Sequence, residues 1–365
     1  MVNEFTLSFP AIRAVQARRE YYVIMCPLKH IPKIFTFDDV ELSPEVRAQR
    51  ILNKSRIPNL AKYIVDNPED YVFSAITASI DGDVIFDALG DSEEETTFGM
   101  LKISLGAKFI INDGQHRRAA IEQAVNLEPK LGNDSIAVVL FLDKGLERSQ
   151  QMFSDLNRHA IRPSRSLGLL YDHRNDMAKI AKLMALKSKA FQGLVDLEKS
   201  SLSERSRKLF TLSSIYTGCQ SLLEHSELTD FENASALCFE FWDEISLHFR
   251  DWQDVREGKV TSGEIRKDKI HSHAIALQCL GIIGSELVLA NPKAWKAPLE
   301  KLRSIDWSRG NASIWEGRAL VGGRVSKTTG NVILMTNYIK KMLSLKLTPE
   351  QLRLENLYLK GANGN

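Results

Sequence analysis

The chain has 365 residues, of which 44% are hydrophobic and 26% charged, and its formal net charge at pH 7 is +2. A chain of this length and composition can bury a sizeable core and is expected to form two domains. The small net charge does not by itself indicate a nucleic-acid partner, because phosphate binding depends on local clusters of Lys and Arg. No apolar run has the length of a membrane span and the amino terminus lacks a signal-peptide pattern, so we expect a cytoplasmic protein without a membrane partner.

Cysteine and histidine give little sign of a metal site. No CxxC pair is present, which excludes a zinc ribbon and a disulfide framework and predicts buried or inert thiols at Cys26, Cys219, Cys238 and Cys279. The segment 271–273 reads His-Ser-His, but residues two apart point away from each other on a helix. We therefore expect no metal there.

The first 165 residues mix strands with helices. Short runs rich in β-branched and aromatic residues predict strands at 21–28, 71–80 and 136–142. Ser43 followed by Pro44 predicts the start of a helix over 43–50, and apolar residues at helical spacing predict another over 57–67. The acidic run at 91–95 is predicted to be a loop.

The stretch FIINDGQHRRAAI, residues 109–121, predicts a strand, a turn and a helix in succession. Asp113 is predicted to be the N-cap, and Gly114 can take a backbone angle that other residues avoid. Arg117 and Arg118 lie in or near the first turn, where free N–H groups already make the potential positive. Two interpretations stay open: a bound anion offsets these charges, or the arginines point to solvent or pair with Glu122.

Beyond residue 166 apolar residues recur at helical spacing. Helices are predicted within 176–195, 203–225, 232–249 and 271–291. Residues 315–343 contain a Gly-rich basic loop followed by an apolar run and a helix. The second domain, 166–360, is therefore predicted to be mostly helical, with a disordered tail at 361–365.

A second polar cluster lies where a helix over 151–162 must end before Pro163. Cations at a helix C-terminus are favourable, which accounts for one or two arginines. The cluster is larger than a helix end requires, and forked Arg donors match phosphate oxygens, so it is also a candidate phosphate-binding set. It comprises Asn157, Arg158, His159, Arg162, Ser164, Arg165 and Ser166.

Both motifs resemble those of the ParB/sulfiredoxin superfamily. Residues 114–120 match its phosphate-binding pattern at Gly114, His116, Arg117 and Ala120, and residues 155–163 resemble a later ParB motif. Gln115 stands where sulfiredoxins carry their reactive Cys, so sulfiredoxin activity is not expected. The Glu of ParB is also replaced, so CTP specificity is not implied.

The full string DGQHR, with residues 153–173 and 315–332, resembles the DGQHR-domain family and in particular its members associated with bacterial DNA phosphorothioation. This resemblance spans most of the chain. It implies an α+β fold in which a ParB/sulfiredoxin-like mixed-sheet domain at 1–165 precedes the mostly helical domain. It further implies a DNA-binding regulatory or accessory protein, a transcriptional regulator of the modification operon.

Related domains of this kind act as nucleotide-dependent switches or nucleoside triphosphatases. The resemblance therefore also implies a nucleoside triphosphate (ATP, GTP or CTP) with Mg²⁺. Its phosphates would be held by Gly114, His116, Arg117, Arg118, Asn157 and Arg158. The alternative function is an NTPase or NTP-dependent DNA nickase of a modification or defence system, in which Asp113 would hold the metal and Gln115 would orient a water molecule.

Double-stranded DNA is the expected partner, contacted through its backbone by basic side chains of the second domain. The residues assigned to this contact are Arg162, Arg165, Arg174, Lys179, Lys182, Arg324 and Lys327, and Arg318 is a further candidate. A solvated loop explains the residues near 324 equally well. A third interpretation is an assembly partner of other phosphorothioation proteins that docks through its helical half. A homodimer would match the two-fold symmetry of many DNA sites.

Overall fold

The structure is a computed structural model that describes residues 6–35, 54–144, 148–158, 163–226 and 230–362. The chain divides into two compact units, residues 1–161 and residues 162–365, and each is described by itself. The helix predicted over 43–50 lies outside the described residues. The fold class is α+β, as predicted, because a mixed sheet in the first unit is followed by helices in the second.

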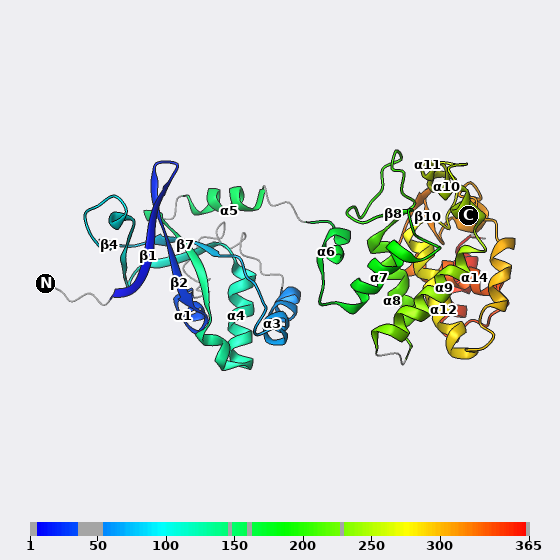
Figure 1. Cartoon of the computed structure of the whole chain (residues 1–365), viewed down its shortest axis with the longest axis horizontal. Coiled ribbons are helices and arrows are strands. Elements are labelled where there is room, and N and C mark those ends of the chain that lie inside the picture. Colours follow the sequence, from blue (N-terminus) through cyan, green and yellow to red (C-terminus); the bar gives the residue numbers. More distant parts are fainter. Residues whose placement is uncertain (1–5, 36–53, 145–147, 159–162, 227–229, 363–365) are drawn as a thin grey trace. The chain divides into compact units, whose positions relative to one another are not determined.

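The first unit is built on a seven-stranded sheet with the order β4-β5-β1-β2-β7-β3-β6 (Figure 1). Strand β3 runs parallel to β7 and antiparallel to β6, and the other neighbours are antiparallel. The sheet is therefore mixed. Its strands are β1 (Thr6–Gln16), β2 (Arg19–Pro27), β3 (Ile76–Asp81), β4 (Val84–Ala88), β5 (Phe98–Ser104), β6 (Lys108–Asp113) and β7 (Ser135–Leu142).

Helices bury one face of this sheet. Ala61 and Ile64 of one helix and Ala120, Ile121 and Ala124 of another share a core with the inward side chains of the strands. In strands such as β5, buried residues alternate with more exposed ones, because successive side chains point to opposite faces of the sheet. The helical elements of the first unit are η1 (Leu28–His30), α1 (Ile31–Ile34), η2 (Lys54–Arg56), α3 (Ile57–Asp66), η3 (Glu95–Thr97), α4 (Gln115–Leu127), η4 (Pro129–Asn133) and α5 (Ser149–Arg158).

The second unit is mostly helical, with two short two-stranded sheets. Its helical elements are α6 (Arg165–Tyr171), α7 (Asp176–Lys187), α8 (Leu212–Leu223), α9 (Phe231–Ser246), α10 (Arg250–Arg256), α11 (Ser262–Asp268), α12 (Ala274–Ala290), η6 (Ala297–Ser304), α13 (Ala312–Trp315), α14 (Thr329–Met342) and α15 (Pro349–Ala362). The strands are β8 (Val195–Asp196), β9 (Phe210–Thr211), β10 (Leu320–Val321) and β11 (Arg324–Val325).

Helices α8 and α12 form the centre of the second unit, and glycine allows them to approach closely. A Cβ on Gly281 of α12 would lie 2.3 Å from the carbonyl oxygen of Gly218 on α8. Aromatic rings fill the surrounding core, where Trp242, Trp252 and Trp315 are fully buried. None of the helices in the described ranges combines the length and apolar character that crossing a bilayer requires.

Several predicted boundaries are wrong, among them the end of the helix predicted within 176–195, which is Lys187. Residues 71–75 precede β3 and are not strand, and the helix predicted from residue 203 begins at Leu212. Arg266 explains why this helix begins later than predicted, because its guanidinium holds the preceding segment as a loop. It donates to the main-chain carbonyls of Ser203, Glu204, Ser206 and Lys208. Helix α15 extends through Ala362, so the first two residues of the predicted tail are helical.

Candidate functional site

The junction between β6 and α4 has the predicted strand, turn and helix, but its cap differs from the prediction. Gly114 is the N-cap, with φ +112°, and no side chain caps the helix. A Cβ there would lie 3.1 Å from Cγ1 of Ile76 and in a backbone region that L residues rarely adopt. Glycine therefore suits this position by its conformation, and the space for a Cβ is tight. Asp113, predicted to be the N-cap, is the last residue of β6.

Asp113 is instead paired with Arg117. Nη2 of Arg117 donates to Oδ2 of Asp113 at 2.8 Å and to the carbonyl oxygen of Ala75 at 3.0 Å. The buried Nε of Arg117 has no hydrogen-bond partner in the described structure. Arg117 is thus fixed at the start of α4 with part of its donor capacity unused, while the Asp113 carboxylate stays 46% exposed.

Arg118 points into the interior of the first unit. Its side chain is buried, and its Nε and Nη2 donate to the carbonyl oxygens of Phe35 at 2.8 Å and Pro32 at 3.0 Å. Its Nη1 pairs with Glu122. The two neighbouring arginines therefore do not converge: Arg117 stays at the helix start, and Arg118 fastens α4 to α1 and to the residue that ends it, Phe35. The pairing with Glu122 is the alternative that the sequence left open.

His116 and Gln115 lie in the first turn of α4. Burial lowers the pKa of His116, and the positive charges of Arg56 and Arg117 lower it further. The side-chain amide of Gln115 donates to the carbonyl oxygen of Ile111 at 3.0 Å and so ties the helix start to β6. Sequence reasoning missed Arg56, because its place beside His116 depends on the packing of α3 against α4.

The later motif is described only in part. Asn157 and Arg158 end α5, but their side chains lie outside the described part of the structure, and Arg162 lies outside it altogether. The start of α5 is anchored beside the junction, because Oγ of Ser149 donates to Oδ1 of the buried Asn112 at 3.0 Å.

In the second unit, two of the predicted DNA-binding residues, Arg165 and Lys327, influence each other electrostatically. Arg165 at the start of α6 is stacked over the ring of Tyr216, with its Cζ 5.5 Å from the ring centroid. Desolvation lowers the pKa of Lys327, and the charge of the nearby Arg165 lowers it further. Neither cation has a carboxylate partner among the described residues. We call this pair the Arg165–Lys327 pair.

The other predicted DNA-binding residues of this unit are separately placed. Lys179 of α7 pairs with Asp176 one turn earlier, at 2.8 Å. Lys182 is half-buried on the same helix, Arg174 is exposed in the turn before it, and Arg324 is exposed at the start of β11.

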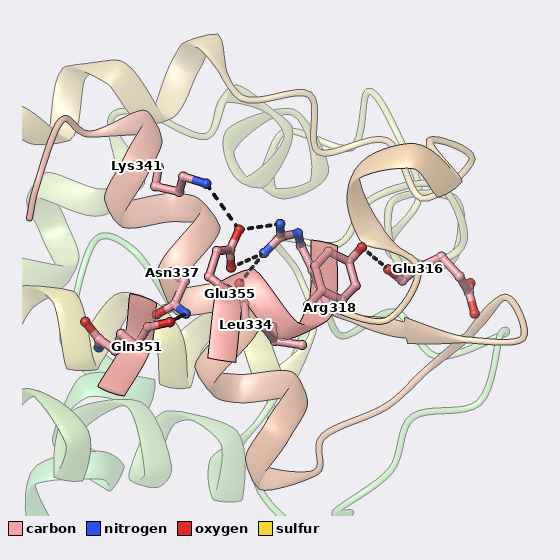
Figure 2. A network of polar contacts seen from close by, with 8 residues as sticks. Glu316, Arg318, Leu334, Asn337, Lys341, Gln351 and Glu355 are labelled. Carbon is pink, nitrogen blue, oxygen red and sulfur yellow. Dashed lines mark hydrogen bonds and ion pairs between the residues drawn. The ribbon is translucent and has the colours of Figure 1, made fainter. Parts of the chain in front are cut away.

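Arg318 is part of the interior rather than of a DNA-contacting loop. It forms a two-pronged ion pair with Glu355 of α15, with Nη1–Oε2 at 2.9 Å and Nη2–Oε1 at 2.7 Å (Figure 2). Its Nη1 also donates to the carbonyl oxygen of Leu334, and its guanidinium lies over the Tyr358 ring. Although burial acts to raise it, hydrogen bonds from Arg318 and Lys341 hold the pKa of Glu355 below its usual value.

With this geometry established, comparison with known proteins adds one match. The family model for DndB, described as DNA-sulfur modification-associated, matches residues 9–346. The chain belongs to the DndB family. Membership associates the protein with DNA sulfur modification, and the matched region includes the β6–α4 junction and the Arg165–Lys327 pair. No curated protein and no solved structure matches the chain.

The His-Ser-His segment of this DndB-family member is engaged by protein groups. The indole N–H of Trp252 donates to Nδ1 of His271 at 3.1 Å, so Nε2 carries the proton and donates to Asp251 at 2.7 Å. Nε2 of His273 lies 2.8 Å from the carbonyl oxygen of Arg266. In the described ranges, no group of three or more His, Cys, Asp and Glu side chains could hold a metal ion.

The four cysteines are free and buried, as predicted. Burial raises the pKa of Cys26 and of Cys279 to about 12, so both thiols are protonated near neutral pH. Thiolate chemistry is therefore not favoured at either position.

Proposed function

We propose that this protein is a DNA-binding regulator of DNA sulfur modification, acting on transcription of the modification operon, and that its second unit contacts the DNA backbone. The observation that carries the proposal is the Arg165–Lys327 pair, together with the family match. The charge of Arg165 acts on Lys327, and a phosphate beside these two cations would be attracted to both. The exposed Arg174 and Arg324 and the half-buried Lys182 would add charge to this contact, whereas Arg318 and the paired Lys179 are not assigned to it.

The test is a binding and footprinting experiment on double-stranded DNA from upstream of the modification operon. We expect the Arg165→Ala, Lys327→Ala double variant to bind at least about tenfold more weakly, with a shallower dependence of affinity on salt because fewer counterions are released. Arg353→Ala is the matched control, since Arg353 is an exposed cation on α15 of the same unit. An unchanged footprint and salt dependence in the double variant would contradict this placement.

We further propose that the β6–α4 junction binds a phosphate of a nucleoside triphosphate. The left-handed Gly114 leaves the first N–H groups of α4 without a side-chain cap, and Arg117 and Arg56 bring positive charge to the side of His116. Arg118 is not assigned to the phosphate, because its donors are used inside the unit. Within this proposal, the half-exposed Asp113 is the residue suited to the magnesium ion of the nucleotide.

Calorimetric titration with ATP, GTP and CTP in the presence of Mg²⁺, each with and without DNA, tests this second part. We expect binding of at least one nucleotide that is weakened about tenfold or more by Arg117→Ala. Phosphate release is measured in the same six conditions. Turnover that is lost in Asp113→Asn would favour the NTP-hydrolysing alternative, and the absence of both binding and turnover would remove the nucleotide from the proposal.

A further inference from the structure

The second unit contains a basic cavity of about 850 Å³ that the proposals above do not use. It is formed where the turn after α7, the connection between α9 and α10, and the end of η6 meet. Its charged lining comprises five Lys or Arg residues and two Asp residues. They are Lys189, Arg250, Arg256, Lys259, Arg303, Asp243 and Asp254.

Both carboxylates of this cavity already have partners. Oδ1 of Asp243 accepts a hydrogen bond from the backbone N–H of Ala190 at 3.3 Å. Asp254 lies 3.7 Å from Nε of Arg250 and 3.6 Å from Nζ of Lys259. The two carboxylates thus contact groups of the cavity wall itself, and the five cations against two carboxylates leave an excess of positive charge.

Two of the cations keep donor capacity for a ligand. Lys189 is exposed, and its ammonium group has no partner in the described part of the chain. Arg303 is exposed too and donates through Nη2 to the carbonyl oxygen of Leu247 at 3.1 Å. Arg256, by contrast, donates to the carbonyl oxygens of Lys189 and Ala190 and so fixes the turn that carries Lys189.

His248 provides an independent observation at the same place. The residue is only 7% exposed and lies in the wall of this cavity and of a neighbouring one of about 210 Å³. Nε2 lies 3.2 Å from Oε1 of Glu244, whereas the buried Nδ1 has no hydrogen-bond partner among the described residues. Buried polar atoms are almost always hydrogen-bonded, so Nδ1 of His248 has a hydrogen-bonding capacity that the described residues leave unused.

We propose that this cavity binds a small ligand with two or more linked phosphate groups. Lys189 and Arg303 would contact the phosphate oxygens, and a small rotation of the His248 ring on binding would bring its buried Nδ1 to the ligand. The volume lies within the range of a few hundred to about 1,000 Å³ that is usual for small-molecule sites. A flexible ammonium and a forked guanidinium together suit a chain of phosphates better than a single carboxylate.

The test is calorimetric titration of the full chain with inorganic triphosphate and, separately, with ATP. We expect the Lys189→Ala, Arg303→Ala double variant to bind triphosphate at least tenfold more weakly. Both residues are exposed, so the variant is expected to fold, and a denaturation curve checks this. His248→Gln keeps a polar group near the position of Nε2, removes Nδ1, and should also weaken binding. Arg353→Ala is the control for loss of one positive charge.

The proposals for the cavity and for the β6–α4 junction can be tested separately. A binding event lost in the cavity double variant but retained in Arg117→Ala supports the cavity site. If wild-type protein binds neither probe, or if all binding is lost in Arg117→Ala and none in the cavity variant, the cavity site is overturned. Two events, each removed by its own variant, would support both sites.

Discussion

Arg318 and Glu355 form a buried ion pair that joins the segment before β10 to the last helix. Glu355 is 1% exposed, and its carboxylate also accepts a hydrogen bond from Lys341 at 3.3 Å. Removing one partner of such a pair leaves the other charge buried and uncompensated. The pair therefore makes α15 part of the stable core of the second unit.

Glu355→Ala should lower the free energy of unfolding by about 3–5 kcal/mol, because the Arg318 guanidinium loses its partner inside the protein. Urea denaturation measures the change. Arg353→Ala, an exposed change on the same helix, should have an effect within about 0.5 kcal/mol. A loss below about 1 kcal/mol for Glu355→Ala would mean that the guanidinium finds water or another partner.

Gly114→Ala should destabilise the first unit by about 1–3 kcal/mol, since an alanine at φ +112° is strained and its Cβ presses on Ile76. Gly168→Ala is the matched control. Gly168 lies in α6, and the position that a Cβ would take there is open. Alanine should therefore leave the free energy of unfolding unchanged or raise it by up to about 1 kcal/mol. Equal effects of the two substitutions, measured by thermal unfolding, would contradict the role assigned to the left-handed turn.

Arg117→Ala and Arg118→Ala should have different effects although the two residues are adjacent. Arg118→Ala leaves the carbonyl oxygens of Pro32 and Phe35 without their donor and should cost about 2–4 kcal/mol of stability. Arg117→Ala removes a partly exposed pair and should cost about 1 kcal/mol while lowering nucleotide affinity. Denaturation curves and titrations of both variants check this, and a reversed order of stabilities would refute the assignment.

Stability should fall between pH 7 and pH 5 partly because of His273. Burial lowers the pKa of His273 to about 4, below its unfolded value of 6.5, so the unfolded state takes up the proton first in this range. The contribution of His273 to the free energy of unfolding is present above about pH 6.5 and is lost as the pH falls toward 4. At pH 5 the loss is about 2 kcal/mol. Burial also lowers the pKa of His271, which adds in the same direction.

Denaturant unfolding at pH 7 and pH 5 measures this loss. His273→Gln, which cannot titrate, should reduce the difference between the two pH values by about 2 kcal/mol. A variant with the same pH dependence as the wild type would show that His273 is not responsible.

The elements that could be predicted are those with a strong local pattern. The apolar run of β7 and the amphipathic stretch of α3 were assigned nearly to the residue, because their burial follows a local periodicity. The strands β1, β4 and β5 were not predicted. β1 and β5 contain Pro10 and Gly99, which weaken a strand pattern, and β4 has no fully buried residue.

At the candidate site, too, features set by neighbouring residues could be predicted from the sequence, whereas features set by tertiary contacts could not. The left-handed Gly114 follows from its place between a strand and a helix. The different roles of Arg117 and Arg118 do not follow from the sequence, because they depend on which side of α4 faces the carbonyls of α1 and its C-cap. The burial of Arg318 could not be inferred either, since its partner Glu355 lies 37 residues away in sequence.

The family match ends at residue 346, three residues before α15 begins. The carboxylate that neutralises Arg318 therefore comes from a helix beyond the part of the chain that the family model matches, while the arginine itself lies within it. A shortened version cut at the family boundary would keep the Arg318 guanidinium and the Tyr338 ring beside it, but would lack both Glu355 and the Tyr358 ring. Recombinant fragments of this protein should accordingly extend through residue 362.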